Sequence, residues 1–434
     1  MRIVHASTHD VWGGAALAAN RLHRGLRAIG KESTMFVVQR SGEGQDVQTF
    51  VPPRDVRSRL VRTVRRNSLV RDMRRYKKSR PAGAEFFSDD RSQFGRAPLL
   101  QMPPCDILNL HWISEFLDYR SLFDWLPRRV PLVWTLHDMN AFTGGCHYDF
   151  GCEKHRNSCG ACPQLGSTVE GDLSRQVWNR KRGAYGRISL KQMQLVTPSR
   201  WMAEEVGKSA LLGRFPVAVI PNGLDVEVFE PRPRSFARDA LGLPQKAKVL
   251  LFAAHTVSER RKGFSILSEA LAGLKEDPNL FVLTVGGYAS VEQVGLRCRS
   301  LGYISNERLL SIVYSAADLC VVPTLQDNLP NIAIESLACG VPIVAFAVGG
   351  LPDIVREGKT GILVPPGDVR QLRIAMAELL RNTDQRMSMA GSCRRAALEE
   401  YSQEVQARRY FTLYETLLGS AADGDKSRLD SNHN

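Results

Sequence analysis

Short, almost entirely apolar runs recur along this chain of 434 residues, and segments with helical periodicity separate them. In the C-terminal half these runs are KVLLFAAH (248–255), LFVLTVGG (280–287), LCVVPT (319–324), PIVAF (342–346) and GILVPP (361–366). Runs of this kind are typical of strands buried on both faces of a parallel sheet. Parallel strands need crossover helices between them, so the alternation predicts an α/β domain with a doubly wound sheet.

The N-terminal half repeats this alternation. Strands are predicted at 3–6, 33–39, 106–111, 131–137 and 195–199, and helices over 13–30 and about 173–188. A segment rich in Pro and turn residues, VIPNGLDVEVFEPRPRS (219–235), joins the halves. We therefore expect two doubly wound domains facing across a cleft, with ligands at the carboxyl ends of the strands.

Bulk properties narrow the class of protein. The first residues, MRIVHAS, predict a buried strand, and no apolar signal-peptide region follows them. No apolar run reaches the length of a transmembrane helix. We expect a cytoplasmic protein, with any membrane contact peripheral. In that compartment the nine cysteines are not expected to form disulfides.

Two acids lie eight positions apart in DNLPNIAIESLACGVPIVAF (327–346). Pro330 suits the first turn of a helix and Gly340 its end, which places Asp327 in the preceding loop and Glu335 inside the helix. Free N–H groups at a helix start can bind a phosphate, and carboxylates can accept hydrogen bonds from hydroxyls. The arrangement suits a sugar joined to a nucleoside through a diphosphate. The alternative is a surface glutamate and a capping aspartate.

The same stretch resembles glycosyltransferase family 4, which has the GT-B fold. The resemblance is carried by the two carboxylates, then ACGVPIVA and VGGLPDIV, with VIPNGLDVEVF, RKGFSILSEAL and GKTGILVPPGD in the family's order. It runs from about residue 1 to 418 and is strongest from 219 to 370. It implies two Rossmann-like domains, a UDP- or GDP-linked sugar donor, retention of anomeric configuration and no metal in the chemical step.

The expected organisation has four parts. Residues 1–215 form the acceptor domain and residues 216–400 the donor domain. A C-terminal helix, 401–418, crosses back to the first domain. The tail, 419–434, is small and polar and is predicted to be disordered.

The resemblance also assigns roles to residues. It implies that Glu335 binds the donor ribose, and that Asp327 holds the transferred sugar, although Asp327 is one methylene shorter than the family's usual Glu. Lys262 matches the family's Lys before a helix-opening Gly. Val257 stands where the family has an Arg, so that role is expected to fall to Arg260 or Arg261. These cations would stabilise negative charge on the departing diphosphate.

Other candidates are strand-end and loop positions. His137 ends a predicted strand and matches a family His that contacts the donor sugar near its reacting carbon; Asp138 either orients it or caps the next segment. His111, at the end of the neighbouring strand, is a weaker candidate for which packing is favoured. The remaining donor-binding candidates are Gly13, Gly14, Tyr303, Asn328, Leu329, Pro330 and Asn331. Gly349 and Gly350 would permit close approach of a ligand or simply form a turn.

A Cys-rich loop, 144–165, follows His137. Its cysteines are Cys146, Cys152, Cys159 and Cys162, and only the last pair has the Cys-x2-Cys spacing of zinc knuckles. Structural zinc, buried free thiols and disulfides stay open as alternatives, and His147 or His155 can replace a thiolate as ligand. Similar loops occur in polysaccharide-assembly members of the family. Because the loop lies directly after His137, we expect it to border the acceptor.

Most of the net charge of +13 lies in residues 54–80, which hold twelve Lys or Arg against two Asp. Apolar residues recur there near helical spacing, at Val56, Leu60, Val64, Leu69, Met73 and Tyr76. A basic amphipathic helix is typical of elements that bind anionic membrane surfaces. A solvated helix is the alternative; nucleic-acid binding is disfavoured because no aromatic interleaving accompanies the charge.

Together these features predict a hexosyltransferase on the inner face of the cytoplasmic membrane. It would transfer a sugar to a lipid-linked saccharide in exopolysaccharide or lipopolysaccharide synthesis, as colanic-acid-type transferases do. No cofactor is expected for the chemistry. Two other classes stay open: a GT-B sugar-nucleotide epimerase or hydrolase, and a non-catalytic membrane-associated adaptor.

Overall fold

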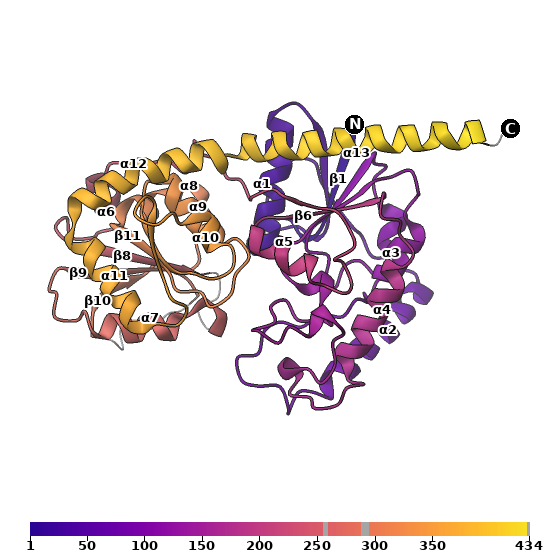
Figure 1. Cartoon of the computed structure of the whole chain (residues 1–434), viewed down its shortest axis with the longest axis horizontal. Helices are drawn as coiled ribbons and strands as arrows, with labels where there is room; N and C mark the ends of the chain where they lie inside the picture. Colours follow the sequence, from indigo (N-terminus) through magenta and orange to yellow (C-terminus); the bar gives the residue numbers. More distant parts are fainter. Residues whose placement is uncertain (255–258, 288–294, 432–434) are drawn as a thin grey trace. The chain divides into compact units, whose positions relative to one another are not determined.

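The computed structural model describes the backbone of residues 1–254, 259–287 and 295–431, with side chains up to residue 419 (Figure 1). The chain divides into two compact units. The first comprises Met1–Ile220 and Gln406–Asn434, and the second comprises Pro221–Val405. Each unit is built around one parallel sheet, so the prediction of two doubly wound α/β domains is confirmed. The predicted cleft between them stays a prediction.

The sheet of the first unit has the strand order β3-β2-β1-β4-β5-β6-β7, and all its pairings are parallel. Its strands are β1 (Arg2–His9), β2 (Glu32–Gln39), β3 (Val47–Thr49), β4 (Ile107–Leu110), β5 (Leu132–Thr135), β6 (Met193–Thr197) and β7 (Val217–Val219). Its helices are α1 (Gly14–Ala28), α2 (Val56–Arg74), α3 (Tyr119–Trp125), α4 (Leu173–Tyr185), α5 (Arg200–Gly207) and α13 (Gln403–Ser431).

The sheet of the second unit has the order β10-β9-β8-β11-β12-β13 and is also parallel throughout. Its strands are β8 (Lys248–Ala254), β9 (Leu280–Gly286), β10 (Arg297–Ser300), β11 (Leu319–Val322), β12 (Ile343–Phe346) and β13 (Gly361–Val364). Its helices are α6 (Arg234–Ala240), α7 (Phe264–Ala272), α8 (Glu307–Ala316), α9 (Asn331–Ala338), α10 (Leu351–Ile354), α11 (Val369–Arg381) and α12 (Thr383–Glu400).

Both faces of each sheet are buried, which explains why the central strands are apolar at most positions. Successive residues of a strand point to opposite faces. In β8, Val249 and Leu251 belong to one apolar cluster, whereas Leu250 and Phe252 belong to the other. In the first unit, Leu132 and Trp134 of β5 face one cluster and Val133 faces the opposite one.

The observed boundaries differ in part from the predicted ones. The first unit extends to Ile220, beyond the predicted end at 215, because β7 pairs with β6 and completes its sheet. The backbone of α13 continues as helix to Ser431, where a disordered tail was predicted from 419 onward. Polar composition does not itself prevent a helix from continuing, and AADGDKSRLD contains several good helix formers. Residues 432–434 lie outside the described part of the chain.

Helix α13 returns from the second unit and packs on the face of the first sheet that α1 also covers (Figure 1). Two hydrogen-bond contacts join this helix to buried strand residues, and a third joins the two strands to each other. The amide of Asn109 donates to Tyr414 Oη over 2.7 Å, and Thr135 Oγ1 donates to Asn109 Oδ1 over 3.1 Å. Thr135 Oγ1 also lies 3.0 Å from Tyr410 Oη. The strands and α13 therefore form one hydrogen-bonded core.

Replacing Tyr414 with Phe removes the acceptor of the Asn109 amide and leaves that amide buried without this partner. Such a loss costs about 1–3 kcal/mol of unfolding free energy. We expect Tyr414→Phe to destabilise the protein by that amount in urea denaturation. Glu415→Ala, at the neighbouring exposed position, is the control and should change stability little. Equal stability of Tyr414→Phe and the parent protein would contradict the proposed role of this network.

Candidate functional site

A buried group of three charges lies at the carboxyl end of the second sheet. Asp327, in the loop after β11, accepts hydrogen bonds on one oxygen, Oδ2, from Arg261 Nη1 over 2.9 Å and from Lys262 Nζ over 2.7 Å. The two cations come from the short 3-10 turn Arg260–Lys262, which follows β8 in the chain. Since β8 and β11 are adjacent strands, the parallel sheet itself brings these loops together.

The charges around Asp327 keep it ionised. Burial favours the neutral carboxyl and raises its pKa, but the positive charges of Lys262 and Arg261 and their hydrogen bonds outweigh this effect. The resulting pKa of Asp327 is about 2. Arg261 is held further by Glu259, whose Oε2 lies 3.1 Å from Nη2. A buried carboxylate with two cationic partners is consistent with the general rule that buried charges occur paired.

Two glycines allow the backbone to close around this group. Gly263 has φ +70°, and a Cβ built there would lie 1.8 Å from the carbonyl oxygen of Pro323. Gly349 has φ +55°, and its Cβ would lie 1.8 Å from the carbonyl oxygen of Asp327. Only glycine adopts such conformations at such close approach without strain. At Gly349 the close neighbour is therefore the backbone of Asp327, and this close approach explains why a glycine stands at this position.

Glu335 is a buried side chain of α9 and not a surface residue, which excludes the surface alternative. Tyr314 of α8 donates its hydroxyl proton to Glu335 Oε2 over 2.8 Å, so the carboxylate is held in one orientation. Helix α9 begins at Asn331, after Pro330 as N-cap, and Asn222 donates to the Asn331 side chain. Asn328 and Leu329, just before the helix, are buried as well.

Two cation candidates are separated by the structure. Arg261 is buried and contacts Asp327, whereas the side chain of Arg260 is exposed. Residues 255–258, which include Val257, lie outside the described residues. Tyr303 is 51% exposed, and its proposed contact with the base stays a prediction.

In the first unit, Gly13 is the N-cap of α1 and has φ +88°, and a Cβ built there would meet no atom within 4 Å. The loop that opens α1 therefore borders open space at Gly13, and the ligand-binding role of Gly13 and Gly14 stays a prediction.

His137 lies just after β5, and its Nε2 is 3.0 Å from Nδ1 of His111. Burial lowers the pKa of His137 to about 4, although the nearby charge of Asp138 acts in the opposite direction. His111 is buried, as the favoured packing role predicts, and it is also hydrogen-bonded to the candidate His137, with the two rings stacked.

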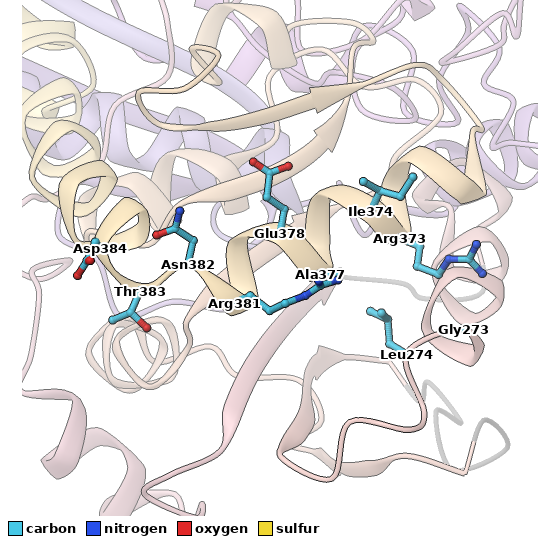
Figure 2. A pocket seen from close by; sticks show the side chains of 10 residues that line it. All are labelled: Gly273, Leu274, Arg373, Ile374, Ala377, Glu378, Arg381, Asn382, Thr383 and Asp384. Atoms are coloured by element: carbon cyan, nitrogen blue, oxygen red, sulfur yellow. The ribbon is translucent and has the colours of Figure 1, made fainter.

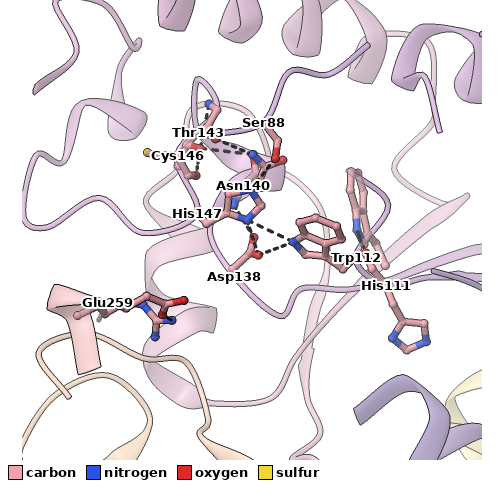
Figure 3. Close-up of polar contacts among 12 residues, drawn as sticks. Ser88, His111, Trp112, Asp138, Asn140, Thr143, Cys146, His147 and Glu259 are labelled. Atoms are coloured by element: carbon pink, nitrogen blue, oxygen red, sulfur yellow. Dashed lines mark hydrogen bonds and ion pairs between the residues drawn. The ribbon is translucent and has the colours of Figure 1, made fainter. Parts of the chain in front are cut away.

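Asp138 makes its hydrogen bonds elsewhere (Figure 3). Its Oδ2 lies 2.6 Å from His147 Nδ1 and accepts from Trp112 Nε1 over 3.0 Å, and Ser88 Oγ lies 2.8 Å from His147 Nε2. Asp138 Oδ1 accepts from the backbone N–H of Asn140. Asp138 thus fixes the start of the Cys-rich loop, as the capping alternative predicted, and His147 is engaged with it.

The four cysteines of the loop are free thiols that line one small cavity of about 20 Å³. The backbone N–H of Gly144 donates to Cys159 Sγ over 3.1 Å. Among the residues that the structure describes, no group of three or more His, Cys, Asp or Glu side chains is arranged to hold a metal ion. No disulfide links these cysteines, and structural zinc at Cys146, Cys152, Cys159 and Cys162 stays a prediction.

Helix α2 forms part of the predicted basic segment, over Val56–Arg74, and none of its residues is buried. Val56, Leu60 and Val64 are 82%, 64% and 60% exposed, so its apolar residues face solvent along with its charges. Only near its C-terminal end do Met73 and Tyr76 pack on an apolar cluster around Phe87. No helix in the described part of the chain combines the length and apolarity that crossing a membrane requires.

Beside the end of α2 lies a hollow of about 610 Å³. Its wall combines apolar side chains with cations: Leu69, Val70, Met73 and Phe87 on the one hand, and Arg74, Lys77, Arg80 and Arg91 on the other. A larger hollow, of about 820 Å³, lies between the end of α7 and α11 in the second unit (Figure 2). No predicted site residue lines this second hollow, and its size does not make it the functional site.

Comparison with known proteins supports the fold. HepE from Anabaena, solved in complex with UDP-glucose, superposes with a TM-score of 0.65 and 16% sequence identity, over 96% of this chain and all of that one. At this identity the likeness shows the fold alone.

Curated relatives are closer in sequence but match only part of each chain. A D-inositol 3-phosphate glycosyltransferase of Corynebacterium urealyticum is 34% identical over 49% of this chain and 54% of its own. A phosphatidyl-myo-inositol mannosyltransferase of Mycobacterium leprae is 30% identical over 58% and 64%. This chain thus spans about half the length of the first curated relatives that it matches.

Two family models match the chain in succession. The model for glycosyl transferases group 1 matches residues 247–382, which cover the Asp327 group and α9. The model for glycosyltransferase family 4 matches residues 12–228, half of the chain, from the loop that opens α1 to the segment that follows β7. The chain therefore belongs to glycosyltransferase family 4, as its sequence motifs predict.

Proposed function

We propose that this protein transfers a hexose from a nucleoside-diphosphate sugar to a hydroxyl group of a saccharide acceptor. The observation that carries this proposal is the buried group of Arg261, Lys262 and Asp327 beside the start of α9. It places two cations and a helix N-terminus in one unit, with an oriented carboxylate at Glu335 in the same helix. Cations and free backbone N–H groups together suit a diphosphate.

Lys262 is the residue best placed to contact the leaving group. Its ammonium has three N–H donors and gives one to Asp327, and its side chain is 18% exposed. The remaining donors can reach phosphate oxygens as negative charge develops there. Arg261 contacts the same carboxylate oxygen and fixes the position of Lys262 relative to the helix start. Interactions of this kind are commonly the largest contribution to such transfers.

Glu335 is proposed to bind the donor ribose, with Tyr314 fixing the orientation of the carboxylate. Asp327 and the backbone of residues 328–331 are proposed to hold the transferred sugar. Because HepE was solved with UDP-glucose, and the matched relatives are named as glycosyl- and mannosyltransferases, a UDP- or GDP-linked hexose is the donor we favour.

The reaction that family membership favours retains the anomeric configuration. The bond between the anomeric carbon and the diphosphate oxygen breaks, and a bond from the same carbon to the acceptor oxygen forms on the same face. The acceptor proton passes to an oxygen of the departing phosphate, which balances the step. Lys262 and Arg261 stabilise the negative charge that develops on that phosphate, and this route assigns no step to a metal.

The acceptor is proposed to be lipid-linked, in exopolysaccharide or lipopolysaccharide assembly on the inner face of the cytoplasmic membrane. Exposed apolar and basic residues of α2 suit an anionic membrane surface. The neighbouring hollow, with apolar walls and cations such as Arg74 and Lys77, suits a lipid that carries phosphate. The relative from Mycobacterium leprae is named after a lipid acceptor, phosphatidyl-myo-inositol.

Donor binding can be tested by thermal shift with UDP, GDP and their hexose conjugates. We expect one of these nucleotides to raise the Tm of the parent protein, since a ligand that binds only the folded state stabilises it. Lys262→Ala should reduce that rise and should lower the transfer rate by about 100- to 1000-fold. Arg260→Ala, at the exposed neighbour, is the matched control and should retain both. The assignment of Lys262 to the donor site would be overturned if no nucleotide raised the Tm of the parent, or if both substitutions had equal effects on Tm and rate. Consumption of the donor without an acceptor would indicate a hydrolase or epimerase.

The charge of Asp327 predicts a dependence of stability on pH. Its folded pKa of about 2 lies below the ordinary value of 3.8, so the ionised group stabilises the fold above about pH 4. The contribution is about 2 kcal/mol and disappears as the pH falls from about 4 to about 2. The difference in unfolding free energy between the parent and Asp327→Asn should therefore shrink over this range. Asp384→Asn, at an exposed position, should show no such change. A difference that is constant with pH would refute this account.

Membrane binding can be measured by sedimentation with vesicles that contain anionic or only neutral lipids. We expect binding to anionic vesicles, weakened by salt because it depends on the charges of residues 54–80. Leu60→Ser should also weaken it, since this exposed side chain would enter the interface. Phe236→Ser, which removes an exposed apolar side chain from α6, is the control. Binding that is equal for neutral and anionic vesicles, or unaffected by Leu60→Ser, would contradict this role of α2.

A further inference from the structure

Three histidines from three adjacent strands, two of them buried and His137 partly buried, form a continuous hydrogen-bonded chain. His5 lies in β1, His111 directly after β4 and His137 after β5, and these strands are neighbours in the sheet. His5 Nδ1 is 3.0 Å from His111 Nε2, and His111 Nδ1 is 3.0 Å from His137 Nε2. Each of the two contacts needs one proton between two nitrogens.

Burial keeps this chain neutral. It lowers the pKa of His5 and of His111 well below the ordinary value, and each of them also lies near the charge that a neighbouring histidine would carry. A neutral imidazole carries one N–H, so each ring donates through one nitrogen and accepts through the other. Only two arrangements make both hydrogen bonds, and they run in opposite directions along the chain. In one, each ring is protonated on Nδ1; in the other, each is protonated on Nε2.

The inner end of the chain distinguishes these two arrangements. His5 Nε2 is buried and has no hydrogen-bond partner among the described residues. If the protons were on Nε2, this position would be an N–H donor buried without a partner. With the protons on Nδ1, it is only an unused lone pair, and an orphaned buried N–H is the rarer of the two in proteins.

The nearest other ring does not change this. His23 lies 6.2 Å from His5 between ring centroids, but its nitrogens contact Ser33 Oγ and the carbonyl oxygen of Gln45. A carbonyl only accepts, so His23 carries its proton on Nε2 and takes part in a separate pair of contacts. At the outer end, the carboxylate of Asp138, next to His137 in sequence, is hydrogen-bonded to His147 and Trp112.

We propose that His111 and His5 are positioning residues that hold His137 as the neutral tautomer protonated on Nδ1. His137 Nε2 is then an acceptor that His111 already uses, and Nδ1 carries an N–H. A ring in this state can donate a hydrogen bond to a hydroxyl oxygen but cannot take up a proton through Nδ1. The tautomer follows from the first unit alone; its use in sugar transfer rests on the proposed function.

The tautomer can be measured without any substrate. Long-range ¹H–¹⁵N correlation spectra of the full-length protein, labelled with ¹⁵N-histidine, distinguish a protonated from an unprotonated ring nitrogen. We expect His137, near neutral pH, to be protonated on Nδ1 and unprotonated on Nε2. Protonation on Nε2, or on both nitrogens, would overturn the proposal. This result does not depend on whether the protein binds a nucleotide sugar.

Substitutions then test the role of His111. His111→Leu removes the group that bonds His137, and we expect the Nδ1–H form of His137 to lose its dominance. His111→Asn is the matched variant, because its amide lies near the position of Nδ1 and should preserve that form. His9→Asn, in a half-buried histidine outside the chain, should have no effect. An unchanged tautomer in His111→Leu would refute the positioning role.

With a bound donor identified, kinetics give a second readout. His111→Leu should lower kcat by about tenfold or more with a smaller change in the KM for the donor, and His111→Asn should restore most of it. If the spectra show the expected tautomer but no transfer is found, the proposed function fails and the positioning role stands. If transfer is found but His137 is protonated on Nε2, the positioning role fails and the proposed function stands.

Discussion

The candidate donor site depends on one carboxylate oxygen, Asp327 Oδ2, which both Arg261 and Lys262 contact. None of the three charges would be stable alone in this buried position, because desolvation of a single ion costs several kcal/mol. Together they fix the loop after β11 against the turn that follows β8. The cations are therefore in place before any diphosphate arrives, and less order has to be imposed when it binds.

The same topological rule builds both candidate sites. In parallel sheets, the carboxyl ends of neighbouring strands lie side by side, so residues far apart in sequence meet there. In the second unit this brings Asp327 to Lys262; in the first, it brings His5, His111 and His137 into one line. The first site pairs opposite charges, whereas burial disfavours the charged form of the three rings in the second.

Much of the fold could be predicted from the sequence, and the exceptions share a cause. Central strands such as β8 and β9 are buried on both faces, so they read as apolar runs. The strands that were missed, β3, β7 and β10, lie at the edges of their sheets. In β10, RCRS, two of the four residues are Arg and none is fully buried. An edge strand is held by backbone hydrogen bonds to one neighbour, so it does not need a hydrophobic pattern. The edge strand β13, GILV, has one and was predicted.

The candidate site likewise contains residues that the sequence predicts and contacts that it does not. Lys262, Asp327 and Glu335 lie within local motifs that specify a helix start, so their positions follow from nearby residues. The choice between Arg260 and Arg261 depends on which side chain the turn directs inward, toward a loop more than sixty positions away. The contact of His111 with His137 also joins separate strands, and the partner of Glu335, Tyr314, lies on another helix. Local pattern therefore predicts which groups can do chemistry, while the long-range pairing that fixes their charge and proton positions is determined by the sheet.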